Sequence, residues 1–596
     1  MARDRRKNNT SIVGNFVWSL KELFLFRRLY FFILLIDSLV RGIFPVVSLL
    51  LLQKLIDLVQ YHTGTLKSAL IVLIAVAAVQ FISEAIMIWT DVKLANFELD
   101  FDLHYQEKVL ERVASLSCKD FEKNHTYNLI NRTQNDANIS VLGSVRIFFA
   151  LITSLIGAMS FAVIIFEFSK LVFVIIVIVP IVRYTLEKRY NIREYEIEKE
   201  NTEPNRRAGY ISFLLTDSEE FKEIKTYGLF HFFIKKYRDI RNECNRKHIA
   251  LNSKRGIVFI LLTFIEKLID LCVILWILKL TFAGTLSIGQ FILYNNAIDS
   301  FKDNVLAIFN QLSSLYKNSS MIEQIRSFFD LKQEVANNEG KIIDKIETIR
   351  LESVSYRYHD SAEYALKNID LEINAGELVA LMGNNGSGKS TLMKIIMGVY
   401  TDYTGKVLIN GHNLRELNTE NYRSKISALF QNYIKYESSI EDNVRYGNIC
   451  DYSNTNRIKE VLKGVKLEEY ENKLSQMLGY QFQNGIQLSI GQWQKLALAR
   501  ALYRNADLYI FDEPNASLDL VTESEVLKTI RSETESKITF IIMHRFNNMT
   551  LHANKIIVLK GGRIVEYGNH TQLIRQQGIY KSLFNKYYGI EDGTNA

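Results

Sequence analysis

A nine-residue segment, 383–391, constrains the fold of this chain more than any other. Its sequence, GNNGSGKST, has the G-x-x-x-x-G-K-S spacing of a P-loop. Glycines at these positions allow backbone N–H groups to close around anionic oxygens. An apolar run at 377–382 precedes the loop, and a helix-forming run at 391–396 follows it. This order of strand, loop and helix predicts an α/β domain that holds phosphates at a helix N-terminus.

Every residue of this loop is expected to contact a bound nucleotide. The residues are Gly383, Asn384, Asn385, Gly386, Ser387, Gly388, Lys389, Ser390 and Thr391. The lysine of such a loop reaches the β- and γ-phosphates, and the hydroxyl that follows it ligates Mg²⁺. We therefore assign these two roles to Lys389 and Ser390.

Two adjacent acids follow an apolar run at 508–511. Asp512 is expected to hold Mg²⁺, and Glu513 is placed to polarise an attacking water molecule. Paired acids after a strand are usually only a solvated turn, but the P-loop upstream favours the catalytic interpretation.

Apolar residues are unevenly distributed along the 596 residues, and most of the long apolar runs lie before residue 315. A helix needs about 20 residues to cross a bilayer. Six segments meet this need, at 29–58, 70–89, 141–166, 171–183 with its continuation, 256–282 and 288–312. The run at 171–179 is apolar on every face, which argues against a soluble helical bundle.

The chain is accordingly predicted to have four parts. These are a basic N-terminus at 1–28, a transmembrane domain at 29–320, a linker at 321–345 and a nucleotide-binding domain at 346–596. The transmembrane domain would have two long cytoplasmic loops, whose tips near 121–126 and 219–227 would meet a cytoplasmic domain. The net charge is +7, but Lys and Arg cluster beside the apolar segments. This is the positive-inside pattern, which predicts a cytoplasmic N-terminus and argues against a nucleic-acid partner.

Ionisable residues interrupt the predicted spans at Asp37, Arg41, Glu84, Glu266, Lys267, Asp270, Asp299 and Asp303. Charges at membrane depth usually face the bundle interior or a water-filled cavity. Because acids outnumber bases, these residues would suit a pathway for a cationic or polar cargo. Alternatively they pair on shared helix faces, as the spacing of Lys267 with Asp270 and of Asp37 with Arg41 allows.

Several motifs together resemble those of the ATP-binding cassette (ABC) superfamily. Residues 488–492, LSIGQ, are similar to its signature LSGGQ. Gln431 matches the Q-loop glutamine, and His544 matches the switch histidine. Asp519 lies where the family has its D-loop, and Tyr358 lies where an aromatic ring stacks on adenine. The resemblance covers essentially the whole chain, as a half-transporter of the exporter type.

The resemblance implies that two chains sandwich two ATP molecules. Each P-loop would face the Ser489, Gly491 and Gln492 of the other chain. Gln431 would act in both metal binding and catalysis, and His544 in catalysis. ATP hydrolysis would then switch the membrane halves between inward-facing and outward-facing states.

Two departures from the family pattern stand out. Ile490 replaces the first signature glycine, a change that we expect to be tolerated because Ser489 and Gly491 are kept. Gln483 stands where exporters usually carry an acid, which bears on coupling more than on catalysis. Glu513 and His544 are both present, which favours a homodimer.

The strings at 478–485 and 488–495 resemble those of bacterial exporters for lantibiotics and related modified peptides. We therefore expect a multi-pass protein of a bacterial plasma membrane that exports an antimicrobial or signalling peptide, with peptide-maturation enzymes as candidate partners. Since only residues 1–28 precede the first predicted span, we expect no N-terminal peptidase domain.

Other functions remain as alternatives. A multidrug or lipid exporter of the same architecture would carry a hydrophobic small molecule instead. Cassette proteins that act on ribosomes or DNA lack spans, so the six apolar segments argue against that class. Nothing in the sequence points to an importer, and the intact Glu513 and His544 argue against a channel or receptor that only binds ATP.

Overall fold

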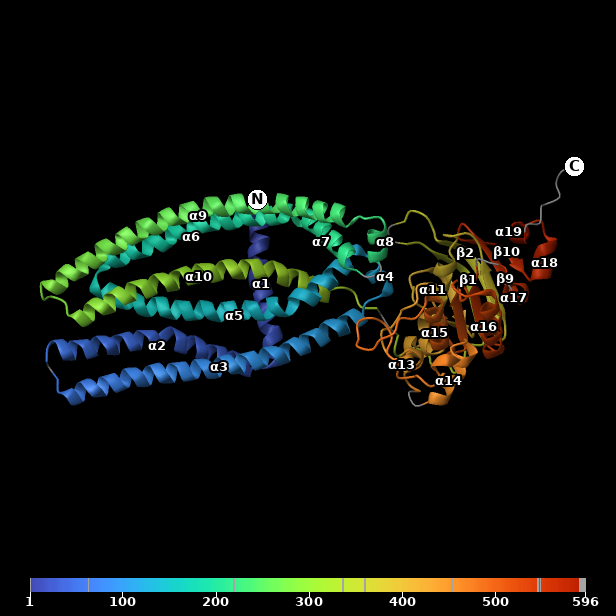
Figure 1. Cartoon of the computed structure of the whole chain (residues 1–596), viewed down its shortest axis with the longest axis horizontal. Coiled ribbons are helices and arrows are strands. Elements are labelled where there is room, and N and C mark those ends of the chain that lie inside the picture. The colour runs from blue at the N-terminus through green and yellow to red at the C-terminus, as the bar shows by residue number, and fades with distance from the viewer. Residues whose placement is uncertain are drawn as a thin grey trace. The chain divides into compact units, whose positions relative to one another are not determined.

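The structure is a computed structural model that describes residues 2–62, 64–217, 220–334, 337–358, 361–451, 454–543, 546 and 548–588. The chain divides into two compact units (Figure 1). The first comprises Met1–Ser115 and Lys123–Lys332, and the second comprises Leu116–Glu122 and Gln333–Ala596.

The first unit is entirely helical where it is described. Its helices are α1 (Ala2–Phe26), α2 (Leu29–Gln60), α3 (Leu66–Ala114), α5 (Asn124–Phe168), α6 (Lys170–Glu200), α7 (Thr202–Thr216), α8 (Phe221–Thr226), α9 (Phe230–Phe282) and α10 (Ile288–Phe329). Each of the six predicted spans lies within a different long helix, namely α2, α3, α5, α6, α9 and α10. Within the unit α2 packs beside α3, α5 beside α10, and α6 beside α9 (Figure 1).

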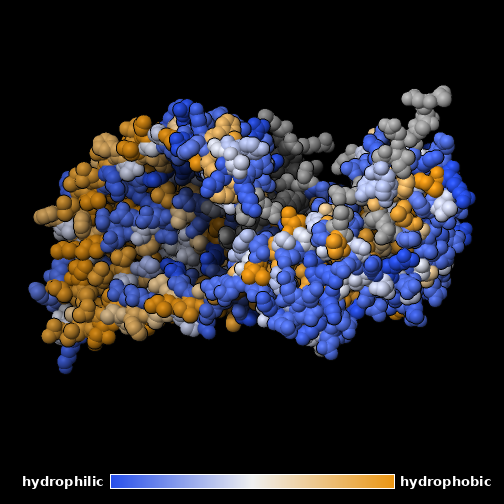
Figure 2. Space-filling view, turned by 45° about the vertical axis from the view of Figure 1, so that its right-hand side comes forward, coloured by the Kyte–Doolittle hydropathy of each residue, from blue (hydrophilic) through white to orange (hydrophobic). Residues whose placement is uncertain are grey.

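Three of these helices are long and apolar enough to cross a membrane, among the residues described. They are α2, α3 and the Ser140–Phe168 part of α5. Large apolar side chains such as Phe81 and Met159 lie exposed on their outer faces, and Figure 2 shows hydrophobic residues spread over this part of the surface. Such an exposed apolar area is typical of a surface that meets lipid. The helices α6, α9 and α10 carry several charges, so the count of six spans stays a prediction.

The last helix of this unit continues beyond the predicted boundary. The helix α10 extends to Phe329, into the first residues of the linker predicted at 321–345. Ile322, Ile325 and Phe328 recur at helical spacing and are buried, so packing of this apolar stripe extends the helix.

Charged side chains inside this unit pair with one another. Lys302 on α10 is buried and forms an ion pair with Asp270 on α9, and its Nζ lies 4.0 Å from Glu266 Oε1. Arg183 Nη1 on α6 lies 3.4 Å from Glu266 Oε2. The predicted pairs also form, with 3.4 Å between Lys267 Nζ and Asp270 Oδ2. Internal pairing is thus confirmed for Glu266 and Asp270.

The predicted Asp37–Arg41 pair forms as well, with Nε and Oδ1 2.8 Å apart. Arg41 Nη2 also lies 2.7 Å from Asp91 Oδ1 on α3, so this ion pair joins α2 to α3. Asp299 and Asp303 are both exposed on α10.

The described part of the second unit contains two sheets. Their strands are β1 (Thr348–Tyr356), β2 (Leu366–Asn374), β3 (Leu378–Met382), β4 (Thr404–Ile409), β5 (His412–Asn413), β6 (Ile426–Leu429), β7 (Leu508–Asp512), β8 (Ile538–Ile542), β9 (Lys555–Lys560) and β10 (Arg563–Gly568). One sheet has the order β2-β1-β4-β5 and is antiparallel. The other has the order β10-β9-β3-β8-β7-β6, and all its pairs are parallel except that of β10 with β9.

The helices of the second unit are α4 (Cys118–Phe121), α11 (Lys389–Ile396), α12 (Thr419–Ser424), α13 (Ile440–Arg445), α14 (Thr455–Gly464), α15 (Ile490–Tyr503), α16 (Leu520–Glu533), α17 (Asn548–Leu551), α18 (His570–Arg575) and α19 (Ile579–Tyr588). The strands β3 and β7 lie on either side of β8. Because these strands are parallel, the P-loop after β3 and the two acids at the end of β7 lie at the same edge of the sheet. Ligands of open α/β sheets bind at this edge.

Candidate nucleotide-binding site

The loop between β3 and α11 has a shape that only glycine permits at two positions. Gly383 has a φ of +140° and Gly388 a φ of +105°. A Cβ on Gly383 would lie 2.2 Å from the carbonyl oxygen of Leu559, and one on Gly388 would lie 2.6 Å from that of Ala365. The glycines of the P-loop pattern are therefore required by close approach of the neighbouring backbone.

Lys389, the first residue of α11, folds back over this loop. Its Nζ donates hydrogen bonds to the carbonyl oxygens of Gly383 at 2.8 Å and Asn384 at 3.1 Å. Burial lowers the pKa of the Lys389 ammonium, while the charges of Asp512 and Glu513 oppose this shift. The ammonium thus lies within the loop, beside the two acids.

The polar groups around the loop fit a phosphate and its metal ion. Burial, and next the charge of Glu513, raise the pKa of Asp512 to about 6, against the opposing charge of Lys389. The Ser387 hydroxyl is buried and has no hydrogen-bond partner within the described part of the chain, whereas Ser390 is exposed. A carboxylate, a hydroxyl and an amide oxygen from Asp512, Ser390 and Gln431 are the kinds of ligand that Mg²⁺ prefers.

Two residues that the sequence assigned to catalysis meet beyond the end of β7. Gln431 Nε2 lies 3.4 Å from Glu513 Oε1. Glu513 itself has a φ of +52°, in the left-handed region that a residue with a Cβ disfavours. The unusual backbone conformation of Glu513 therefore sets the direction of its side chain.

A buried glutamine on α15 holds this turn, and sequence reasoning assigned it no role. Gln494 is 4% exposed. Its Nε2 donates to the Glu513 carbonyl at 2.8 Å, and its Oε1 accepts from the Ser517 N–H at 2.9 Å. Gln494 lies among apolar neighbours, with Trp493 and Leu496 also buried. The sequence signal that could have revealed Gln494 is a polar residue on a helix face that is otherwise apolar.

The signature residues form the N-terminal cap of α15. The Ser489 hydroxyl accepts from the Gln492 N–H at 3.2 Å, and the Gln492 Oε1 accepts from the Ser489 N–H at 2.9 Å. This reciprocal capping box fixes the start of the helix. A Cβ on Gly491 would lie 2.8 Å from the Ser517 carbonyl oxygen, whereas the Ile490 side chain is 66% exposed. Replacing the first signature glycine therefore creates no clash within this chain.

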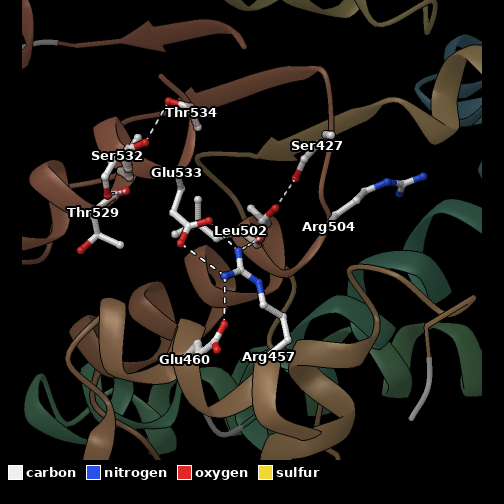
Figure 3. Close-up of polar contacts among 12 residues, drawn as sticks. Ser427, Arg457, Glu460, Leu502, Arg504, Thr529, Ser532, Glu533 and Thr534 are labelled. Carbon is white, nitrogen blue, oxygen red and sulfur yellow. Dashed lines mark hydrogen bonds and ion pairs between the residues drawn. The ribbon is translucent and has the colours of Figure 1, made fainter. Parts of the chain in front are cut away.

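The other end of α15 is anchored as well (Figure 3). The Ser427 hydroxyl on β6 donates to the Ala501 carbonyl at 2.7 Å. Arg457 on α14 reaches the Leu502 carbonyl at 3.5 Å and, with the same nitrogen, the Glu533 carboxylate on α16 at 2.5 Å. Carbonyls of a last helical turn lack partners within the helix, so these contacts satisfy them and join α15 to both neighbours.

Two further predicted residues have their own partners. The Tyr358 hydroxyl lies 2.9 Å from Thr391 Oγ1, which joins the expected adenine platform to α11. Asp519 caps α16 by accepting from the Val521 and Thr522 N–H groups, and the hydrogen bond from Thr522 is the main cause of its lowered pKa. His544 lies outside the described residues.

A short segment from between α3 and α5, Leu116–Glu122, belongs to the same unit as this site. Glu122 Oε1 accepts from the Tyr400 hydroxyl at 2.8 Å and from Lys394 Nζ at 3.0 Å. The Tyr400 ring meets the Tyr358 ring edge to face, with 5.9 Å between their centroids. The first of the two predicted loop tips, near 121–126, overlaps this segment. Through Tyr400 the segment is packed close to Tyr358, the residue expected to stack on adenine.

Comparisons with known proteins agree with this arrangement. The family model for the ABC transporter transmembrane region matches residues 28–301, and that for the ABC transporter matches residues 366–516. The subtilin transport ATP-binding protein of Bacillus subtilis is 30% identical, over 94% of this chain and 92% of its own length. The nisin transport ATP-binding protein of Lactococcus lactis subsp. lactis is also 30% identical, over 95% of each chain.

More distant proteins match over most of the chain as well. An ATP-dependent lipid A-core flippase of Wigglesworthia glossinidia brevipalpis is 25% identical, over 85% of each chain. The solved structure of a bacterial Atm1-family ABC exporter with ATP bound has a TM-score of 0.75 at 19% identity, covering 94% of this chain and 97% of its own. The predicted fold class, a helical transmembrane domain fused to an α/β P-loop domain, is confirmed.

Proposed function

This chain belongs to the ABC transporter family, and we propose that it exports a modified antimicrobial or signalling peptide. It is an exporter half-transporter of a membrane, in which ATP hydrolysis is coupled to transport. The peptide cargo is supported by the relatives named for subtilin and nisin transport, which match over nearly the whole chain. A lipid or multidrug exporter is the second candidate, because the lipid A-core flippases also match.

The observation that carries the catalytic proposal is the contact between Gln431 and Glu513 at the sheet edge that also bears the P-loop. In this proposal Glu513 polarises the attacking water, Gln431 orients it, and Lys389 neutralises charge on the phosphates. Ser390, Asp512 and Gln431 would hold Mg²⁺, which would supply positive charge beside the phosphates. We also propose a catalytic role for His544, from its place in the motif order.

A second copy of the chain would complete each site. The N-terminus of α15 has a dipole that favours anions, which supports a phosphate contact by Ser489, Gly491 and Gln492 of the opposite chain. Asp519 would lie at the same interface, and Tyr358 would stack on adenine. A homodimer is proposed because Glu513 and the switch histidine are both retained.

The orientation of the chain is proposed from its charges. Lys and Arg cluster at 3–7, 27–28, 188–189, 206–207 and 235–236, which favours a cytoplasmic N-terminus and nucleotide-binding domain in a bacterial plasma membrane. Peptide-maturation enzymes are candidate partners on that side.

The test is ATP-dependent uptake into inside-out membrane vesicles. A leader-bearing modified peptide, a lipophilic dye and a fluorescent lipid would be compared, with Glu513→Gln vesicles as the blank. Uptake of the peptide alone is expected. Uptake of only the dye or the lipid would replace the peptide proposal with the second candidate. In the same preparation, Lys389→Ala should weaken ATP binding, and an unchanged affinity would contradict the assigned phosphate contact.

A further inference from the structure

Glu513 holds a backbone conformation that its side chain disfavours. At a φ of +52° the Cβ is crowded by the following carbonyl oxygen. A residue keeps such a conformation only where surrounding contacts over-determine it, and these residues gather at functional sites. The contacts that hold Glu513 in place are therefore candidates for a part in the chemistry of its carboxylate.

Among the described residues, two backbone hydrogen bonds and one side chain hold the backbone of this turn. The Glu513 N–H donates to the Ile542 carbonyl of β8 at 3.1 Å, and the Glu513 carbonyl accepts from the Ala516 N–H at 3.3 Å. The same carbonyl accepts from Gln494 Nε2 at 2.8 Å. Gln494 thus supplies the shortest of the three bonds, and it is the contact that comes from α15.

The amide of Gln494 is fixed at both of its polar atoms. While Nε2 holds the Glu513 carbonyl, Oε1 accepts from the Ser517 N–H at 2.9 Å. The far end of α15 is anchored through Ser427 and Arg457 (Figure 3). The helix that begins with the signature residues is therefore joined to the sheet at both ends, and only the Gln494 end contacts the acid.

We propose that Gln494 is a positioning residue for ATP hydrolysis, which sets the direction of the Glu513 carboxylate from the signature helix. The proposal rests on the proposed role of Glu513 in polarising water. Gln431 Nε2 and Glu513 Oε1 are 3.4 Å apart, near the limit of a hydrogen bond, so a small rotation at Glu513 would separate them. The rate of ATP hydrolysis at each site would accordingly depend on the position of the N-terminal end of α15 relative to Glu513.

The test is a Gln494→Glu substitution in the full-length protein in lipid nanodiscs. The two side chains have nearly the same shape, and a carboxylate oxygen still accepts from Ser517. It cannot donate to the Glu513 carbonyl and instead repels it. We expect kcat for ATP hydrolysis to fall by about 10- to 100-fold, as for other small misplacements of catalytic groups. The Kd for ATP and the KM should stay within about twofold, because the P-loop is untouched.

Ser427→Ala is the matched control, because it removes a buried hydrogen bond to the other end of the same helix. We expect it to lower the thermal midpoint without changing kcat by more than about twofold. An equal loss of kcat in both variants would overturn the proposal by showing that the effect is general loosening of α15. If Gln494→Glu does not fold, Gln494→Met replaces it, since it keeps the length and makes neither bond.

A Glu513→Gln arm separates this inference from the function on which it rests. Loss of hydrolysis in Glu513→Gln together with wild-type kcat in the Gln494 variants would overturn the positioning role alone. Retained hydrolysis in Glu513→Gln would overturn the assigned role of Glu513, and the positioning role with it.

Discussion

Lys302 on α10 is buried against Asp270 on α9, and α9 lies within the segment that matches the ABC transporter transmembrane region. A buried ion pair gains little over a well-packed apolar pair, but removing one partner leaves an uncompensated charge. We expect Lys302→Met alone to destabilise the protein by about 3–5 kcal/mol. Lys302→Met with Asp270→Leu should recover most of this loss, as measured by thermal unfolding of the detergent-solubilised protein.

The same pair also tests the role of charge in transport. Because Asp270 is engaged with Lys302, the double apolar variant should keep transport if this acid only pairs. Loss of transport in a stable double variant would instead revive the interpretation that Asp270 contacts a cationic cargo.

The raised pKa of Asp512 predicts a conflict between stability and function. Its pKa is about 6 in the folded protein against an ordinary 3.8, so the folded state binds more protons between these values and stability falls as pH rises from about 4 to 6. Asp512→Asn removes the titrating carboxyl group and with it this loss of stability. Without nucleotide, we expect the variant to have a higher thermal midpoint than the wild type at pH 7.5, with a gap that narrows towards pH 4.

Adding Mg²⁺ and ATP provides the converse measurement. The cation should stabilise the wild type more than Asp512→Asn, because the carboxylate then gains a partner. Equal stabilisation of both proteins would mean that Asp512 does not hold the metal ion.

Arg457 joins three helices through one guanidinium (Figure 3). It bonds the Glu533 carboxylate and the Leu502 carbonyl, and it also reaches the more exposed Glu460 at 3.3 Å. We expect Arg457→Ala to lower stability by about 1–3 kcal/mol, measured by denaturant unfolding of the full chain. Arg457→Lys should recover less than half, because an ammonium lacks the planar fork that serves several acceptors. Glu460→Ala, which removes only an exposed pair, should change stability by less than about 0.5 kcal/mol.

The sequence predicted those features of the fold that depend on neighbours along the chain. The strands β3 and β7 and the helix α11 lie within a residue or two of their predicted positions, because a P-loop and apolar runs are local patterns. Gln494 was missed because its partners, Glu513 and Ser517, belong to another segment. The Lys302–Asp270 pair was missed for a similar reason, since pairing between helices depends on their rotation and relative height, which periodicity in one helix does not supply.

Glu122 and Tyr400 should act as one unit in coupling. The Tyr400 hydroxyl lies 2.8 Å and 3.0 Å from the two carboxylate oxygens of Glu122, so Glu122→Gln and Tyr400→Phe disturb the same interaction. Each is expected to lower the ratio of cargo-stimulated to basal ATP hydrolysis. In a double-mutant cycle the two losses should be non-additive, with a coupling energy of about 0.5–3 kcal/mol. Additive losses would show that Tyr400 acts independently of Glu122.

Two neighbouring signature positions, Ile490 and Gly491, should differ in how strongly substitution affects ATP hydrolysis. A Cβ on Gly491 would meet the Ser517 carbonyl oxygen at 2.8 Å, so Gly491→Ala must push α15 away from the turn that Gln494 holds. We expect its ATPase kcat to fall by at least about tenfold. Ile490 is 66% exposed, and Ile490→Gly should cost less than about 1 kcal/mol in helix propensity, with kcat within about threefold of wild type. Steady-state hydrolysis by both variants makes the comparison, with the thermal midpoint of each measured to confirm that the protein is folded. A larger loss in Ile490→Gly than in Gly491→Ala would mean that the isoleucine contributes a contact of its own to the nucleotide sandwich.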